Sequence, residues 1–247
     1  MASRRTCCAD RVGRRRRAGV SRRAPVTAST SVEEPFWARG AVVVGVDEVG
    51  KGAWAGPLVI GAVILDTSGG AADVPAGVRD SKRLSATVRE RLDLEIRARA
   101  RAASTGWATA LECDQLGMSA AQRLACRRAL DGLGVHVDVA VTDGKWDFVS
   151  PHVAEVRTVI GGDDLSASIA AASIVAKVAR DAAMREVAAH HPHWSFESNK
   201  GYPCMRHRAG LAAWGPSVEH RRSWAFMDDL VWGGLQRWQR DGQISLL

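Results

Sequence analysis

The sequence predicts an α/β fold in which helices flank a mixed β-sheet, followed by a C-terminal helical segment. Short β-branched apolar runs alternate along the chain with segments of helical periodicity, which is the element pattern of such a sheet. The 247 residues are 46% hydrophobic and 25% charged, a composition typical of a folded globular protein and not of a disordered or fibrous one. No apolar run reaches about 18 residues, so neither a transmembrane helix nor a membrane partner is expected.

Residues 1–38 are expected to form a disordered, arginine-rich tail. Residues 1–30 contain nine Arg and one acid, Asp10, so their net charge is +8, whereas the other 217 residues carry −1. The basic character of the chain therefore says little about what the body binds. Three interpretations of the tail remain open: a solubilising or polyanion-binding extension, an organelle transit peptide, or a start codon placed too far upstream.

The body is expected to become ordered near Ala41, where the apolar runs begin. Ala41–Val46 and Leu58–Leu65 are apolar and rich in β-branched residues, as buried strands are. A glycine-rich connection, Val49–Pro57, joins them. Three further strands are predicted at Thr105–Leu111, Val135–Thr142 and Val153–Ile160.

Helices are predicted between and after these strands, at Leu84–Ala103, Ser119–Leu130 and Ser166–Ala189. In the first of them an apolar residue recurs every four positions, so one face should be buried. The third is rich in alanine. Beyond about residue 190 the chain is rich in His, Trp and Gly, and one or two short helices are expected there. Trp54, within the glycine-rich connection, either lies exposed beside the functional site or packs beneath it, and the other eight Trp are expected to pack in the core and against helices.

The five cysteines do not predict a disulfide framework. Their number is odd, no CxxC pair is present, and the chain is long enough to build a core without cross-links. We therefore expect a reducing compartment and a cytoplasmic protein.

Acidic residues follow three of the predicted strands. Asp47 and Glu48 end the first apolar strand, and a buried ionised acid is costly unless it is paired or binds a metal. Both can reach one site where the strand ends and its pleat relaxes. Asp143 ends a second strand, and Asp163 lies with Asp164 beyond a third. Carboxyl ends of strands are where open α/β sheets form sites.

Each of these acids also has a structural interpretation. Asp143-Gly144 alone suits a turn, and Asp163 or Asp164 alone suits a helix N-cap. Their joint recurrence favours a carboxylate cluster. All-oxygen ligands select hard cations such as Mg²⁺ or Mn²⁺, and two such ions can clamp the attacking and leaving oxygens of a phosphodiester.

A partial P-loop pattern overlaps the first acidic pair. Gly45, Gly50 and Lys51 have the spacing of a P-loop, but Gly52 stands where the motif requires Ser or Thr. Asp47 and Glu48 would also lie inside the phosphate cradle and repel its ligand. An NTPase is therefore not predicted.

The chain resembles the bacterial ribonuclease HII family, the type 2 ribonucleases H, over about residues 41–240. Six segments in the family's order carry the resemblance: Asp47–Gly52, Asp80–Ser85, Asp143–Lys145, Gly162-Asp163 with Ser168–Asp181, Lys200–Tyr202 and His220–Trp224. The resemblance implies an RNase H-like mixed sheet, with residues 39–247 as the catalytic domain and its C-terminal helical segment from about residue 190.

The resemblance also implies an activity and its residues. The family cleaves RNA in RNA–DNA hybrids and cuts on the 5′ side of a lone ribonucleotide in duplex DNA, leaving 3′-hydroxyl and 5′-phosphate ends with the help of two Mn²⁺ or Mg²⁺ ions. The implied catalytic and metal-binding residues are Asp47, Glu48, Asp143 and Asp163, and Asp164 is assigned to helix capping. Both kinds of duplex are the expected partners, and the protein is expected to be a monomer.

Five residues are implied to bind the substrate: Gly50, Lys51, Gly52, Lys82 and Tyr202. The glycine turn resembles the element that reads the 2′-hydroxyl, the group that distinguishes RNA from DNA. Lys51 stands where the family has Arg, and Lys cannot make a bidentate phosphate contact. Lys82 either contacts a phosphate or is a solvated cation at a helix start. Tyr202, the only Tyr, is implied to stack on the junction sugar, or else is a loop aromatic; His220 and Arg221 are expected to brace the C-terminal segment.

Two other functions remain open. A non-catalytic protein could bind nucleic acid through the arginine-rich tail, and the acids would then be dispensable. A phosphatase or exonuclease could use a similar carboxylate site, although Tyr202 and the glycine turn better suit a duplex substrate.

Overall fold

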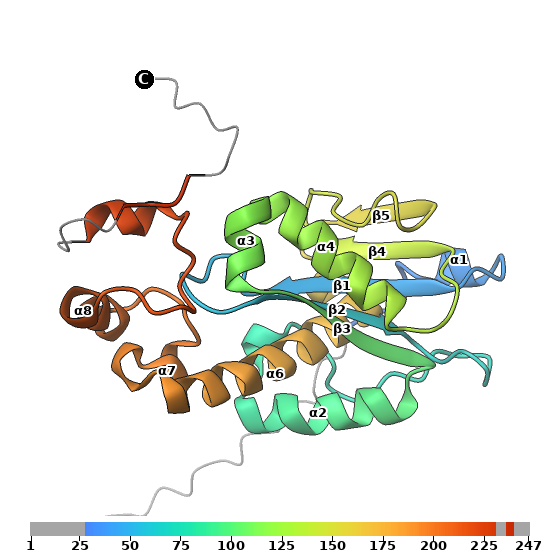
Figure 1. Ribbon diagram of the computed structural model, residues 1–247. Helices are drawn as coiled ribbons and strands as arrows, with labels where there is room; N and C mark the ends of the chain where they lie inside the picture. Colours follow the sequence, from blue (N-terminus) through green and yellow to red (C-terminus); the bar gives the residue numbers. More distant parts are fainter. Residues whose placement is uncertain (1–27, 231–235, 240–247) are drawn as a thin grey trace, which may run out of the picture.

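A five-stranded mixed sheet forms the centre of the computed structural model, which describes residues 28–230 and 236–239 (Figure 1). The strands are β1 (Val43–Val49), β2 (Leu58–Ile64), β3 (Ala102–Ala108), β4 (Val139–Asp143) and β5 (Glu155–Val159), in the order β3-β2-β1-β4-β5. β1 pairs antiparallel with β2 and parallel with β4; β2–β3 is antiparallel and β4–β5 parallel. The predicted fold class, a mixed sheet flanked by helices, is confirmed.

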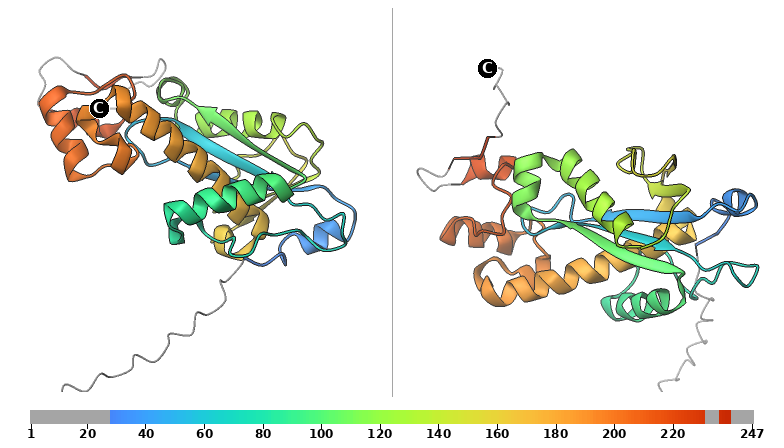
Figure 2. Two further views of the ribbon diagram at one scale, coloured as in Figure 1. Left: turned by 90° about the horizontal axis from the view of Figure 1, so that it is seen from below. Right: turned by 45° about the vertical axis from the view of Figure 1, so that its right-hand side comes forward.

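Helices cover both faces of this sheet (Figure 2). One face carries α2 (Ala86–Arg99) and α6 (Ala167–His190), and the other carries α3 (Ala110–Leu116) and α4 (Met118–Asp131). The shorter elements are α1 (Glu34–Trp37), η1 (Ser81–Arg83), α5 (Gly162–Leu165), η2 (Pro192–Trp194), α7 (Phe196–Asn199), α8 (Met205–Trp214) and η3 (Ala225–Asp229). No helix in the described ranges is long and apolar enough to cross a membrane.

The alanine-rich helix α6 packs unusually close to β1 and β2. A Cβ at Gly45 would lie 2.1 Å from the Ser168 main chain, and one at Gly61 would lie 2.2 Å from the Ala172 carbonyl oxygen. Small residues on both surfaces therefore bring helix and sheet together. Gly45 is in the middle of a strand and serves this packing, which agrees with the rejection of a P-loop.

Two element boundaries differ from the sequence prediction. The helix expected to reach Ala103 ends at Arg99, and the strand expected at Thr105–Leu111 spans β3 instead. Thr109 then caps α3, and its side chain and that of Glu112 form a reciprocal capping box. This Thr-x-x-Glu signal is readable from sequence and explains why the strand stops before Leu111.

The expected disorder of the first 38 residues is wrong for residues 28–38. The Ala28 main-chain N–H donates to the Val78 carbonyl at 2.8 Å. Glu33 is fully buried, and its carboxylate accepts hydrogen bonds from Ser166 and Ser168 at the start of α6. This segment is therefore part of the folded body, and the rest of the tail lies outside the described residues.

The elements after α6 gather at the end of the sheet where β1 terminates (Figure 1). They enclose their own apolar cluster, and Trp54 from the glycine-rich connection stacks on Phe226 there with ring centroids 4.6 Å apart. Trp54 therefore packs against the C-terminal segment. Three other Trp do not pack in the core as expected, because Trp146, Trp214 and Trp238 are at least 46% exposed.

Candidate active site

Two of the predicted acids, Asp47 and Asp143, lie side by side on the neighbouring parallel strands β1 and β4. β1 and β4 pair with Val46 opposite Thr142, so the next residues, Asp47 and Asp143, lie at the same level of the sheet. Side chains at the same level of adjacent strands face the same side. Asp47 is 6% exposed, and Asp143 is the last residue of β4. The two carboxylates therefore share one edge of the sheet.

Glu48 joins this pair from within a regular strand. β1 continues to Val49, and Glu48 pairs with Ile60 of β2. The expectation that the pleat relaxes at the two acids is wrong, because the ladder with β2 runs through both of them. Even so, Asp47 and Glu48 line one cavity, and the Glu48 main-chain N–H donates to Asp47 Oδ1 at 2.8 Å.

Helix α5 carries the fourth acid to the same edge. The Gly162 N–H donates to Asp143 Oδ1 at 2.7 Å, which fixes the start of α5 against the end of β4. Asp163 is 8% exposed, and Lys82 Nζ lies 3.4 Å from its Oδ2. Burial, followed by the charge of Asp80, raises the pKa of Asp163, and Lys82 offsets part of this rise.

Asp164 does not cap a helix as the sequence suggested. It lies inside α5, which begins after Gly161, and Ser166 caps α6. The Asp164 carboxylate instead accepts two hydrogen bonds from Arg83, at 2.9 and 3.2 Å. Both side chains are more than half exposed. Asp164 is therefore one half of a surface ion pair, because a separate helical turn begins at Gly162.

The chemistry of these four acids fits divalent cations. Burial, followed by the charge of Glu48, raises the pKa of Asp47 to about 8, and Asp143 adds to the repulsion. Crowded acids of this kind are relieved by a cation that takes oxygen ligands. In the described ranges no three acidic, His or Cys side chains already stand at ligating separation, so these carboxylates would have to turn toward an ion.

A cavity of about 340 Å³ opens beside Asp47 and Glu48. Its other lining residues are Val49, Ser81, Lys82, Ser173, Lys177 and Tyr202. The Ser173 side chain lowers the pKa of Asp47, against the larger effect of burial, and its hydroxyl oxygen lies 2.9 Å from that of Ser81. Acids, lysines and an aromatic ring thus meet in one hollow, as binding of a sugar-phosphate backbone requires.

The glycine turn, defined here as Gly50–Gly52, borders this cavity. Gly50 has φ +89°, a conformation that favours glycine, and its N–H donates to the Tyr202 hydroxyl at 3.1 Å. Lys51 is exposed, and its Nζ lies 3.4 Å from Glu48 Oε1. Lys51 and Gly52 are both exposed, and within the described chain their main-chain N–H groups donate to no protein acceptor.

The amino-acid sequence matches the family model described as Ribonuclease HII over residues 44–227. The chain belongs to the ribonuclease HII family. It is 46% identical over 190 residues to the ribonuclease HII of Streptomyces avermitilis, covering 76% of this chain and 79% of that protein. With the ribonuclease HII of Caulobacter vibrioides it shares 48% identity over 185 residues, covering 75% and 85% respectively.

The fold agrees with this membership. The crystal structure of the ribonuclease H2 from Pyrococcus horikoshii OT3 matches with a TM-score of 0.62 and 25% identity, over 76% of this chain and 95% of that one. Ribonuclease HII proteins are endoribonucleases of the ribonuclease H class, so the chain is a hydrolase acting on RNA–DNA substrates. The resemblance inferred from the six sequence segments is confirmed.

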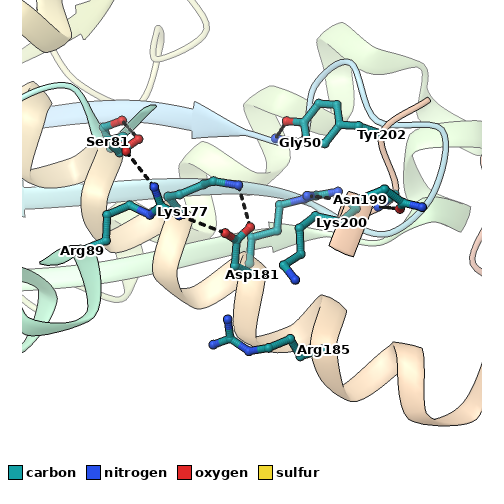
Figure 3. A network of polar contacts seen from close by, with 12 residues as sticks. Gly50, Ser81, Arg89, Lys177, Asp181, Arg185, Asn199, Lys200 and Tyr202 are labelled. Carbon is teal, nitrogen blue, oxygen red and sulfur yellow. Dashed lines mark hydrogen bonds and ion pairs between the residues drawn. The ribbon is translucent and has the colours of Figure 1, made fainter. Parts of the chain in front are cut away.

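The candidate site also contains residues that the sequence analysis did not single out one by one. Lys177 lies one helical turn beyond Ser173 on α6, lines the cavity and donates to Asp181 Oδ1 at 2.6 Å. Arg89 of α2 lies 3.7 Å from the other oxygen of the same carboxylate. Figure 3 shows this group beside Tyr202. The four-residue spacing of Ser173, Lys177 and Asp181, which puts them on one face of α6, was a signal readable from sequence.

Proposed function

We propose that Asp47, Glu48, Asp143 and Asp163 form the catalytic and metal-binding site of this enzyme. The observation that carries the proposal is the register of β1 and β4, which puts Asp47 and Asp143 at one level of the sheet. The hydrogen bond from Gly162 to Asp143 then joins the turn that bears Asp163 to them. The substrates are RNA–DNA hybrids and duplex DNA that contains a single ribonucleotide.

The reaction is hydrolysis of a phosphodiester bond on the 5′ side of a ribonucleotide, leaving 3′-hydroxyl and 5′-phosphate ends. When bound, two Mn²⁺ or Mg²⁺ ions would supply an activated water molecule and charge stabilisation at the leaving 3′-oxygen. The four carboxylates would hold these ions. Ser173 supports this set because its side chain lowers the pKa of Asp47, against the larger effect of burial, and so favours the ionised carboxylate that binds a cation.

The remaining predicted residues bind and orient the duplex. The free N–H groups of the glycine turn can contact the ribose 2′-hydroxyl and the adjacent phosphate. Lys82 is 74% exposed, and the acids around it raise its pKa although burial opposes this. It therefore stays charged and can contact a phosphate. Tyr202, oriented by Gly50, stacks against the sugar where RNA meets DNA.

The decisive experiment uses a duplex that carries one ribonucleotide, incubated with Mn²⁺, with Mg²⁺ and with a chelator. We expect cleavage 5′ of the ribonucleotide only when a divalent ion is present, with ends that a DNA ligase assay identifies as 3′-hydroxyl and 5′-phosphate. Asp164→Asn is the matched control for Asp143→Asn, because Asp164 is an acid close in the fold that lies outside the cavity. Cleavage that survives in Asp143→Asn would reject this site.

The same experiment tests the non-catalytic alternative. If the arginine-rich tail were the functional part, the protein would bind the duplex without cutting it. Asp143→Asn would then leave duplex binding unchanged. We also propose that the enzyme is a cytoplasmic monomer, and sedimentation velocity at several concentrations measures its oligomeric state.

A further inference from the structure

Two arginine side chains are fully buried beneath the glycine-rich connection. Arg180 of α6 and Arg221 near the C-terminus are both 0% exposed. Each of their hydrogen bonds ends on a main-chain carbonyl oxygen and none on a carboxylate, within the part of the chain that the structure describes. Buried charges are normally paired with an opposite charge. Arg180 and Arg221 are therefore buried cations whose hydrogen-bond partners, among the described residues, are carbonyl groups alone.

Arg180 joins the connection to the segment that carries Tyr202. Its Nε donates to the Pro57 carbonyl at 2.9 Å and its Nη2 to the Ala55 carbonyl at 3.2 Å. Its third donor, Nη1, reaches the Lys200 carbonyl at 2.9 Å. The guanidinium carbon lies 5.3 Å from the centre of the Tyr202 ring, within the range of a cation–π contact. One planar group thus holds two loops and the ring.

Arg221 holds the same connection from the C-terminal side. Its Nε and Nη2 donate to the Gly56 carbonyl at 3.2 and 3.0 Å, and its Nη1 donates to the Lys51 carbonyl at 3.0 Å. Because these carbonyls point inward to the arginines, the connection is held as a fixed loop. Arg221 thereby fixes the main chain of Lys51 within the glycine turn, whose residues Lys51 and Gly52 are exposed.

Glycine is required at the point of contact. A Cβ on Gly50 would lie 2.2 Å from Arg180 Nε and 2.7 Å from the Pro57 carbonyl oxygen. A Cβ on Gly201 would lie 2.2 Å from the Ala55 carbonyl oxygen. These close approaches let Gly50 donate to the Tyr202 hydroxyl, so the turn, the arginine and the ring form one contiguous assembly.

Burying the charged guanidinium of Arg180 costs desolvation free energy, which an apolar side chain packed at the same place would not cost. The Arg180 side chain is fully buried, and this burial lowers its pKa to about 10. Even whole buried ion pairs are often replaceable by apolar residues without loss of stability, and within the described residues Arg180 has only carbonyl hydrogen-bond partners to offset the burial of its charge. Fold stability therefore does not explain why a buried cation is present here. A guanidinium group with three fixed donors does explain how two loops are held in one relative geometry.

We infer that Arg180 is a positioning residue for ribonucleotide recognition, which holds the glycine turn and Tyr202 in the one relative geometry that recognises a single RNA–DNA junction. This inference rests on the proposed function of the turn and of Tyr202. A lone ribonucleotide offers a single RNA–DNA junction, so the glycine turn and Tyr202 must both be correctly placed relative to each other to bind it. A continuous hybrid offers many 2′-hydroxyl groups, so its cleavage depends less on the relative placement of these two elements.

The test compares Arg180→Lys with wild type on the two substrates. Lysine keeps the charge but cannot make the three-way fork. We expect kcat/KM for the single-ribonucleotide duplex to fall about tenfold more than kcat/KM for the continuous hybrid, the loss expected for one or two hydrogen bonds. Arg123→Lys is the matched control, because Arg123 also donates to two main-chain carbonyls and lies over a Trp ring, away from the cavity.

A spectroscopic readout separates positioning from general destabilisation. Tyr202 is the only tyrosine of the chain, so ¹³C-tyrosine labelling gives a single set of ring signals. We expect these signals to move in Arg180→Lys and to stay in place in Arg123→Lys at equal loss of thermal stability. We also expect the selectivity effects of Arg180→Lys and Tyr202→Phe to be non-additive in a double-mutant cycle.

The outcomes distinguish the inference from the function on which it rests. Wild-type protein that fails to cut the single-ribonucleotide duplex would reject the proposed function. Wild-type activity on both substrates, with equal losses in Arg180→Lys or an unmoved tyrosine signal, would reject only the positioning role. If neither Arg180→Lys nor Arg180→Gln folds, Arg180 is a folding residue and the inference is likewise overturned.

Discussion

Replacing His220 by glutamine should make the fold less sensitive to acid. His207 and His220 are both buried, with their Nε2 atoms 2.9 Å apart. His207 Nδ1 lies 2.9 Å from the Tyr202 carbonyl oxygen, which can only accept, so this nitrogen carries a proton. His220 Nδ1 accepts from the Ser217 N–H at 2.9 Å, and its Nε2 therefore donates to His207. Both rings are neutral, and no site remains for another proton.

The size of the effect follows from the shift of one pKa. Burial, followed by the proximity of His207, lowers the pKa of His220 from 6.5 to about 3. The unfolded chain therefore binds a proton at pH 5 that the folded chain does not, so acid favours unfolding. The stabilisation is present above pH 6.5 and is lost as the pH falls toward 3. Between pH 7.5 and pH 5 the loss for this group is about 2 kcal/mol.

The assay is urea unfolding of wild type and His220→Gln at pH 7.5 and pH 5. A glutamine amide can still donate to His207 and accept from Ser217, but it does not titrate. The other acid-sensitive groups are present in both proteins, so the difference between their losses reports the titration of His220 together with its coupling to His207. We expect wild type to lose about 2 kcal/mol more than the variant over this interval. Equal losses would refute the neutral, buried pair.

Three further predictions concern the site and the tail. Asp143→Asn should abolish cleavage and keep the wild-type melting temperature, because an amide is a poor ligand for a divalent ion; turnover by the folded variant would remove Asp143 from the site. Deleting residues 1–27 should leave turnover unchanged and make log K for duplex binding less steep against log salt, since nine Arg are lost; an unchanged slope contradicts this. Tyr202→Ala should reduce cleavage at a single ribonucleotide by roughly 5- to 150-fold, more than cleavage of a continuous hybrid; the paired kcat/KM values decide, and equal losses would make the ring a general packing residue.

The acids of the candidate site stand out in the sequence because two apolar runs stop at them. β4 does end at Asp143, but β1 continues past Asp47 to Val49, so the apolar run marks only roughly where that strand ends; parallel strands still bring such acids to one edge of the sheet. The pairing of β1 with β4 was not readable, since it depends on which strand lies next to which. That Asp47 and Asp143 lie at the same level of the sheet is therefore known only from the register of β1 and β4 in the structure.

Other parts of the structure left no local signal in the sequence. Glu33 looked like part of a polar tail because its partners, Ser166 and Ser168, lie more than 130 residues away. Arg180 looked like one charged position on a long helix, and its carbonyl acceptors belong to two distant loops. Contacts between a side chain and distant main chain do not create periodicity, so pattern reasoning cannot find them.

The distribution of charge explains how an anionic duplex could approach a cluster of acids. Asp47 and Glu48 lie at one side of the cavity, and Lys82 and Lys177 lie in the same lining. Arg180 adds a positive charge just beneath the glycine turn, where its carbonyl acceptors face the protein interior. These cations offset part of the negative charge of the nearby acids at the turn. A phosphate would be drawn to the turn and the lysines, and the carboxylates would be left to bind cations between protein and substrate.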